Sequence, residues 1–166
     1  LSAKHVYETS WLSSRGEADW VVVANIDEHL HHSNMAEYLA RQRQAGVTAV
    51  PALGYQMLAE DWPRPGSLLW RDYPYGAPWE NMSKLQIFRP DRISAVEFSP
   101  GRHRTALDGD VVLPPRDEVA NLHYKYLGVA RTAARHATQN DRLGRKDHAR
   151  GWGHKYQWTD EELGAD

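Results

Sequence analysis

The segment 20–26 constrains the fold more than any other part of the sequence. It reads WVVVANI, an almost unbroken run of apolar, largely β-branched residues, and it stops abruptly at Asp27 and Glu28. Such runs are typical of a strand buried on both faces of a parallel sheet, with helices packed against each face. We therefore expect an α/β protein with a central strand here, whose carboxyl end carries two acids.

A helix and a second strand follow in the order of a βαβ unit. Asn34 is a predicted helix cap, Glu37 completes a capping box, and Gly46 is the predicted stop. A strand is expected over residues 47–53, where Pro51 indicates an edge position or a bulge. This order predicts a crossover connection within an α/β sheet.

The rest of the chain is predicted to hold a helix ending near Gly16, a long loop, several short strands and a helical tail. The loop, residues 59–80, is rich in Pro, Trp, Gly and Tyr, and loops of this length are usually functional or mobile. Residues 129–150 have a basic helical pattern, so we expect a helical tail over 129–166 in a single domain spanning 1–166. The predicted strands are 85–88, 95–98, 111–113 and 121–126.

Composition narrows the function classes. The chain carries seven Trp and eight Tyr but two Phe. Amphipathic aromatics stack on sugar rings and line polar sites, but they also serve as large core residues, so composition alone leaves both interpretations open. The absence of Cys excludes disulfides and zinc–thiolate sites. A net charge of −2 gives no general attraction to nucleic acid, and no apolar run approaches the roughly 20 residues that span a bilayer.

The acidic end of the predicted strand is the first candidate site. In open α/β sheets, ligands bind just outside the carboxyl ends of strands. Mg²⁺ and Mn²⁺ are natural partners for carboxylates placed there. Asn25 and Asp27 are two positions apart, so on a strand their side chains would face the same side. The alternative is that Asp27 and Glu28 only begin a turn, and the local pattern does not decide between the two.

His123, within the predicted strand 121–126, is the second candidate. A His in an apolar strand is more often a hydrogen-bonded core residue than a ligand. The interpretation of His123 as a ligand is favoured only if folding brings it close to Asp27. An imidazole ligand would favour Mn²⁺ over Mg²⁺. Lys125 is expected on the same face, where it would suit either a phosphate or a surface ion pair.

The remaining polar candidates are weaker. Lys84, just before a predicted strand, and His103, in a turn-like segment, are each better explained as surface residues when taken singly. His29, His31 and His32 form a cluster after the acidic pair, but their spacing matches no closed structural zinc site. A metal-dependent hydrolase built on this cluster is a further alternative.

Taken together, these motifs resemble bacterial family-2-like glycosyltransferases of the GT-A fold. In that group the strand-end motif reads like DxDEFL, and here residues 25–30 read NIDEHL after ADWV at 18–21. Any one motif is weak, but several in the expected order over nearly the whole chain are fairly specific. The further matching stretches are GYQM at 54–57, SK at 83–84, IFRP at 87–90, GRH at 101–103, HYKYLG at 123–128 and GWGHKY at 151–156.

The resemblance implies transfer of a sugar from a nucleotide-sugar donor to a glycan or lipid-linked acceptor, assisted by Mn²⁺ or Mg²⁺. Asp27 matches the usual metal ligand, and His123 matches a His that completes the metal or phosphate site. An inverting reaction also needs a carboxylate base, for which Asp61 and Glu60 are the candidates. The substrate-binding residues that the resemblance implies are Asn25, Glu28, Lys84, His103, Lys125 and Trp152.

The sequence departs from this family at two points. Asn25 stands where the motif has its first acid, so a lower metal affinity is expected. The family has a nucleotide-binding half before the buried strand, whereas here Trp20 lies close to Leu1. We therefore expect a fragment or processed product. Its expected fold is a partial GT-A, Rossmann-like mixed sheet. Such a sheet exposes an apolar edge, which an oligomer or partner chain is expected to cover.

These departures give an alternative function, a carbohydrate- or partner-binding remnant without turnover. By analogy with the family, the expected role is bacterial polysaccharide synthesis at a cytoplasmic, membrane-peripheral site. Nucleic acid is not an expected partner, because the aromatics do not interleave with the basic segment 129–150.

Overall fold

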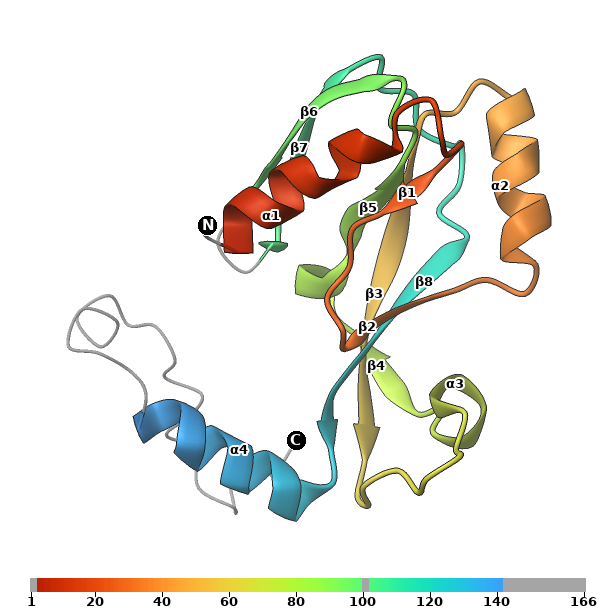
Figure 1. Cartoon of the computed structure of the whole chain (residues 1–166). Helices are drawn as coiled ribbons and strands as arrows, with labels where there is room; N and C mark the ends of the chain where they lie inside the picture. Colours follow the sequence, from red (N-terminus) through yellow and green to blue (C-terminus); the bar gives the residue numbers. More distant parts are fainter. Residues whose placement is uncertain (1–2, 100–101, 142–166) are drawn as a thin grey trace. The chain divides into compact units, whose positions relative to one another are not determined.

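The structure, a computed structural model, describes residues 3–99 and 102–141. Over this range the chain is mixed α/β, with a curled mixed sheet and helices (Figure 1). None of the helices in the described part is long and apolar enough to cross a membrane.

The chain divides into two compact units. The first unit is Leu1–Gln56 with Ala77–His123, and the second unit is Met57–Gly76 with Tyr124–Asp166.

The main sheet has the strand order β1-β5-β3-β8-β2, and β4 also pairs with β3. Both β1 and β3 are antiparallel to β5, and β2 is antiparallel to β8. Figure 1 shows the neighbours β3 and β8 running in the same direction, so the sheet is mixed. The strands are β1 (Val21–Val22), β2 (Glu28–His31), β3 (Ala49–Ala59), β4 (Gly76–Pro78), β5 (Lys84–Phe88) and β8 (Val119–Leu127).

The amino-terminal helix packs on one core of the first unit. Helix α1 (Ala3–Thr9) continues as a 3-10 turn, η1 (Ser10–Ser14), and buries Trp11 edge-on against Phe88 with ring centroids 5.1 Å apart. Gly16 follows with a φ of 75°, a left-handed conformation that favours glycine. The predicted helix stop near Gly16 is therefore confirmed. A separate hairpin packs beside α1 and is formed by β6 (Ile93–Phe98) and β7 (Thr105–Gly109).

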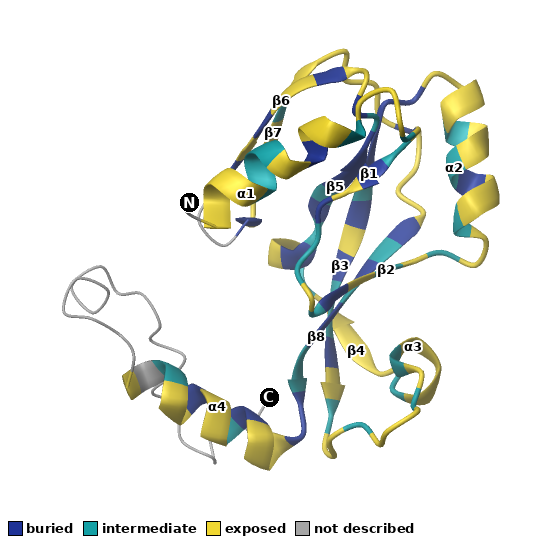
Figure 2. Cartoon of the chain, in the orientation of Figure 1, coloured by how far each residue is buried: buried dark blue, intermediate teal, exposed yellow. Residues whose placement is uncertain are grey.

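Helix α2 (Met35–Gln44) has the predicted N-cap and stop but not the full capping box, because the Asn34 backbone N–H donates to His32 Nδ1 instead of the Glu37 carboxylate. The Asn34 side chain accepts a hydrogen bond from the Glu37 backbone N–H at 3.3 Å, and its amide donates to the Glu37 carboxylate at 2.7 Å. Gly46 follows the helix with a φ of 80°. Figure 2 shows that α2 is mostly exposed. Its buried residue is Tyr38. Tyr38 packs in a core cluster with Val47, Val50, Ala52, Ile87 and Val119.

The apolar segment 20–26, which constrained the predicted fold most, is also where the structure differs most from the prediction. Only Val21 and Val22 pair as a strand, at an edge of the sheet, and residues 23–27 lead through a turn into β2. Val22 is half-exposed and Ile26 is 98% exposed. The prediction of a long strand buried on both faces is therefore wrong. β-Branched residues also suit edge strands and extended segments, and tertiary pairing decides between these environments.

Most other strand predictions are confirmed with shifted ends. Pro51 lies at a bulge, since the β3–β5 register shifts between Val50 and Pro51. The segment 111–113 is not a strand, because Val112 is held by lateral hydrogen bonds with Thr48 instead of a ladder. The long loop contains a short helix, α3 (Leu69–Asp72), and is followed by a 3-10 turn, η2 (Glu80–Met82). The confirmed strands are those predicted at 85–88, 95–98 and 121–126.

The second unit contains the end of β3, α3, the end of β8 and helix α4 (Val129–Asp141). Helix α4 confirms the start of the predicted basic helix at 129. The remainder of the predicted helical tail, with Trp152, lies outside the described residues. The single-domain organisation stays a prediction.

Candidate metal and phosphate site

Strand pairing brings the acidic turn to His123. In the β2–β8 register, Glu28 lies opposite His123, which places the preceding residue, Asp27, beside the imidazole. The Asp27 carboxylate Oδ2 lies 3.6 Å from His123 Nε2. The Asp27 side chain is 24% exposed, whereas His123 is 7% exposed. Two residues far apart in sequence thus form one site that solvent reaches through Asp27.

A glutamine fixes the tautomer of His123. The Gln56 amide N–H₂ donates to the His123 backbone carbonyl at 3.0 Å, so the Gln56 Oε1 is the atom that faces the ring. That oxygen lies 2.7 Å from His123 Nδ1. Because Oε1 can only accept, Nδ1 must carry the proton. In the neutral imidazole, Nε2 then has its lone pair available on the side of Asp27.

This arrangement suits a cation between Asp27 and His123. A separation of 3.6 Å is too long for a hydrogen bond, so the Asp27 carboxylate and His123 Nε2 face each other without a direct bond. Two ligands each about 2.1 Å from an ion lie roughly 3–3.7 Å apart, so both atoms could reach one Mg²⁺ or Mn²⁺. Within residues 3–99 and 102–141, no group of three or more His, Cys, Asp or Glu side chains could hold a metal. Water and phosphate oxygens would have to complete the coordination.

A buried ion-pair network lies directly behind this turn. The Glu28 carboxylate accepts hydrogen bonds from Lys84 Nζ at 2.6 Å and from Gln86 Nε2 at 2.8 Å. The side chains of Glu28 and Lys84 are each 1% exposed. The Arg102 guanidinium lies 3.7 Å from the same carboxylate. Two buried cations thus face one carboxylate, which leaves a surplus of positive charge beneath the turn.

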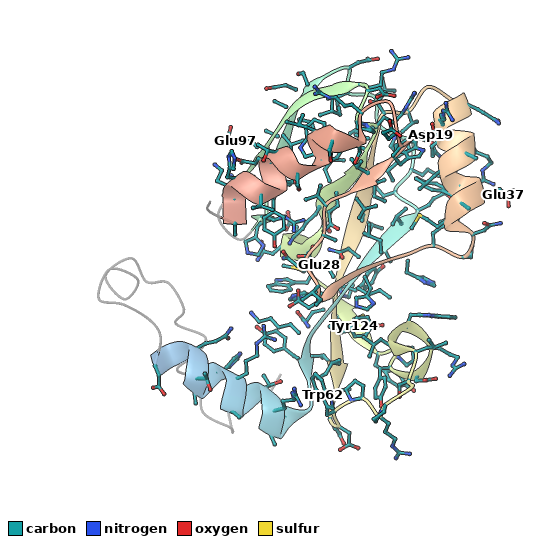
Figure 3. The ribbon with its side chains drawn as sticks, viewed as in Figure 1. Asp19, Glu28, Glu37, Trp62, Glu97 and Tyr124 are labelled. Carbon is teal, nitrogen blue, oxygen red and sulfur yellow. The ribbon has the colours of Figure 1, made fainter. Side chains whose placement is uncertain are left out.

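The network holds Glu28 in its charged form. Burial by itself would raise the pKa of Glu28, because it disfavours the carboxylate. The hydrogen bond and charge of Lys84, the charge of Arg102 and the backbone N–H of Asn25 together outweigh burial, so the pKa of Glu28 lies below its ordinary value. Glu28 was predicted to contact substrate, but its burial makes it an internal anchor of the turn (Figure 3).

Asn25 is used inside the same network. Its Oδ1 accepts from Tyr7 Oη at 3.0 Å and from Arg102 at 2.9 Å, while its Nδ2 donates to Glu28 Oε1 at 2.7 Å. An aspartate could accept the first two hydrogen bonds but could not make the third, and it would place two carboxylates against each other. Asn25 therefore organises the turn, and its predicted contact with substrate stays a prediction.

Sequence reasoning missed Arg102. It was quoted only as the neighbour of His103, but its side chain is buried, donates to the Val23 carbonyl and stacks over the rings of Tyr7 and Phe98 at 4.6 and 5.0 Å. Its backbone has a φ of 58°, which is rare for a residue with a side chain. His103 is exposed, with Nδ1 2.9 Å from the Asn81 carbonyl.

The remaining residues that were predicted as site residues do not join Asp27 and His123. Lys84 is a buried ion-pair partner, so its interpretation as a surface residue is wrong, and its burial also argues against direct substrate contact. His29 and His31 lie at exposed positions of β2, and His32 is 3.9 Å from Glu118, so no zinc site forms among them. The second unit contains Glu60, Asp61 and Lys125, and the described residues do not include Trp152.

Comparisons with known proteins add no relative to this picture. No family model, no curated protein and no solved structure matches the chain. The functional conclusion therefore rests on the order of the sequence motifs and on the geometry around Asp27 and His123.

Proposed function

We propose that the chain is the metal- and acceptor-side part of a glycosyltransferase that moves a sugar from a nucleotide-sugar to a glycan or lipid-linked acceptor. One observation carries the proposal. Asp27 and His123 meet at 3.6 Å, with Nε2, the ring nitrogen that does not face Gln56, on the side of the carboxylate. The glycosyltransferase-like motifs, in their expected order, give this pair its functional meaning.

Each residue of the site has a role in this proposal. Asp27 and His123 would hold the divalent cation, which would supply Lewis-acid stabilisation for a departing diphosphate. Asn25, Glu28 and Arg102 keep the turn rigid, so that Asp27 is positioned before the donor binds.

The residues that the motif order suggests for the catalytic base and for a phosphate contact lie in the second unit. Asp61 and Glu60 are the candidate bases for the acceptor hydroxyl. Lys125, whose ammonium lies 5.6 Å from the centroid of the Tyr126 ring, is the candidate partner for phosphate charge. These roles follow from the motif order and stay proposals.

Calorimetry of UDP and GDP binding to the full chain, with and without Mn²⁺, tests the proposal. We expect binding that requires Mn²⁺ and is lost in Asp27→Ala. Asp108→Ala removes an exposed carboxylate on β7 of the same unit and serves as the matched control. Binding without Mn²⁺, or equal in both variants, would contradict the assignment of Asp27.

A binding module without turnover is the second candidate. It is favoured by Asn25, whose amide is committed to Tyr7, Arg102 and Glu28, so the turn offers one carboxylate fewer than the family motif. A folded chain that binds saccharides but neither nucleotide in the presence of Mn²⁺ would support this alternative. Sugar transfer from any nucleotide-sugar would exclude it.

A further inference from the structure

The second unit contains a polar pocket in the loop between β3 and β4. Its volume is about 380 Å³, within the range of small-molecule sites. The pocket lies wholly within one compact unit. The residues that line it are Asp61, Trp62, Arg64, Ser67, Asp72 and Tyr73.

Trp62 is held in place although half of it is exposed. The Arg131 guanidinium of α4 lies over its ring, 3.9 Å from the centroid. Behind it, Gly128 has a φ of 73°, and a Cβ at that position would lie 3.0 Å from the Trp62 backbone nitrogen. Gly128 is also tied to Ala59 by a backbone hydrogen bond of 2.8 Å. Trp62, labelled in Figure 3, therefore lines the pocket as a residue held by these contacts, with 51% of its surface exposed.

The other walls of the pocket are fixed by local hydrogen bonds. The Tyr73 hydroxyl accepts from the Arg64 backbone N–H at 3.2 Å. The Asp72 carboxylate accepts from the Leu68 N–H at 2.9 Å and pairs with Arg71 at 2.7 Å. The charge of Asp72 is therefore already balanced within the loop.

Two opposite charges remain among the lining side chains. The Asp61 carboxylate can accept hydrogen bonds, and the Arg64 guanidinium can donate them. Because the two charges balance, the lining has no strong preference for an anion or a cation. An aromatic platform flanked by one acceptor and one donor group matches a neutral molecule that has an apolar C–H face and a rim of hydroxyls.

We infer that this pocket binds a neutral saccharide, with a pyranose ring stacked on Trp62 and its hydroxyls bonded to Asp61 and Arg64. This inference rests on the proposed function, in which the saccharide is the acceptor. Binding of the saccharide itself requires neither the donor nor the metal, so it can be measured separately.

The test is a glycan array of neutral oligosaccharides, probed with the full chain in EDTA without nucleotide. Calorimetry then measures the affinity for the strongest array ligand. We expect Trp62→Ala to weaken binding about tenfold, the size expected when an aromatic stack is lost. Trp70→Ala is the matched control, because Trp70 is also 51% exposed and lies in the same unit but does not line the pocket. We expect its affinity to stay unchanged.

Asp61→Asn provides a second variant that keeps the shape of the pocket while removing a charged acceptor. It should also weaken saccharide binding, and it decides the test if Trp62→Ala does not fold. The inference is overturned if the folded chain binds no neutral oligosaccharide on the array, or if Trp62→Ala and Trp70→Ala bind equally well. Neither result affects nucleotide binding with Mn²⁺, so the pocket and the proposed function can fail independently.

Discussion

The turn at Asp27 and the pocket at Trp62 use charged residues in opposite ways. Behind the turn, Glu28 and Lys84 are almost fully buried and hydrogen-bonded to each other. In the pocket, Asp61 and Trp62 are exposed. A buried polar network is costly when one member is lost, whereas an exposed side chain contributes little to folding. Substitutions behind the turn should therefore affect stability first, and those in the pocket should affect binding.

Glu28→Gln should have the largest effect on stability. It leaves the Lys84 ammonium buried without its counter-charge, which costs about 3–5 kcal/mol of the free energy of unfolding. Urea denaturation followed by circular dichroism measures the change. The control is Glu97→Gln, because Glu97 pairs with Lys4 at 3.6 Å on the surface and its side chain is 77% exposed. Equal losses in the two variants would remove the distinction between the network and the surface.

Asn25→Asp should destabilise the chain by about 1–3 kcal/mol, because it replaces a donor to Glu28 with a second carboxylate. The same substitution introduces the acid that the glycosyltransferase motif, to which the sequence was compared, has at this position. If Asn25 organises the turn, Asn25→Asp will not bind Mn²⁺ more tightly than the unchanged chain. Tighter Mn²⁺ binding with unchanged stability, measured by calorimetry and urea denaturation, would instead identify position 25 as a ligand position.

The network should also make the first unit sensitive to acid. The pKa of Glu28 is lowered below the ordinary value of 4.5 in the folded state, so its contribution is fully present above that pH and is lost as the pH falls through the folded-state pKa. A lowering by one pKa unit corresponds to about 1.4 kcal/mol. Urea denaturation between pH 3 and pH 7 should show a shallower acid loss in Glu28→Gln than in Glu97→Gln. Identical slopes would mean that Glu28 titrates normally.

Trp62→Ala should have the smallest effect on folding. With half of the ring in solvent, we expect a change of less than about 1 kcal/mol, most of it from the lost stacking of Arg131. The comparison with Glu28→Gln by the same denaturation measurement tests whether the pocket and the network differ as described. A loss as large as that of Glu28→Gln would make Trp62 a structural residue instead of a binding platform.

Local signals in the sequence were sufficient where the interaction itself is local. The N-cap at Asn34 was predicted, because the hydrogen bonds that join it to Glu37 span only three positions. At Pro51 an edge position or a bulge was predicted, because proline cannot donate to a strand ladder, and the structure has the bulge. The strand 121–126 was predicted from its composition, but its partner β2 was not, since register depends on the whole sheet.

Predictions that depend on residues far apart in the sequence were wrong or could be made only as conditions. Lys84 was interpreted as a surface residue because its partner, Glu28, is 56 positions away. The meeting of Asp27 and His123 could be stated only as a condition. Arg102 was overlooked because nothing in a short turn indicates that a guanidinium will be buried against two aromatic rings.

The central claim is that Asp27 and His123 together hold a divalent cation that receives the donor diphosphate. Pulsed EPR of Mn²⁺ bound to the full chain with UDP tests it most directly, because nitrogen and phosphorus nuclei near the ion give separate couplings. We predict an imidazole nitrogen coupling that disappears in His123→Gln, together with a phosphorus coupling from UDP. Bound Mn²⁺ with a phosphorus coupling but no nitrogen coupling, or no bound Mn²⁺ at all, would contradict the claim.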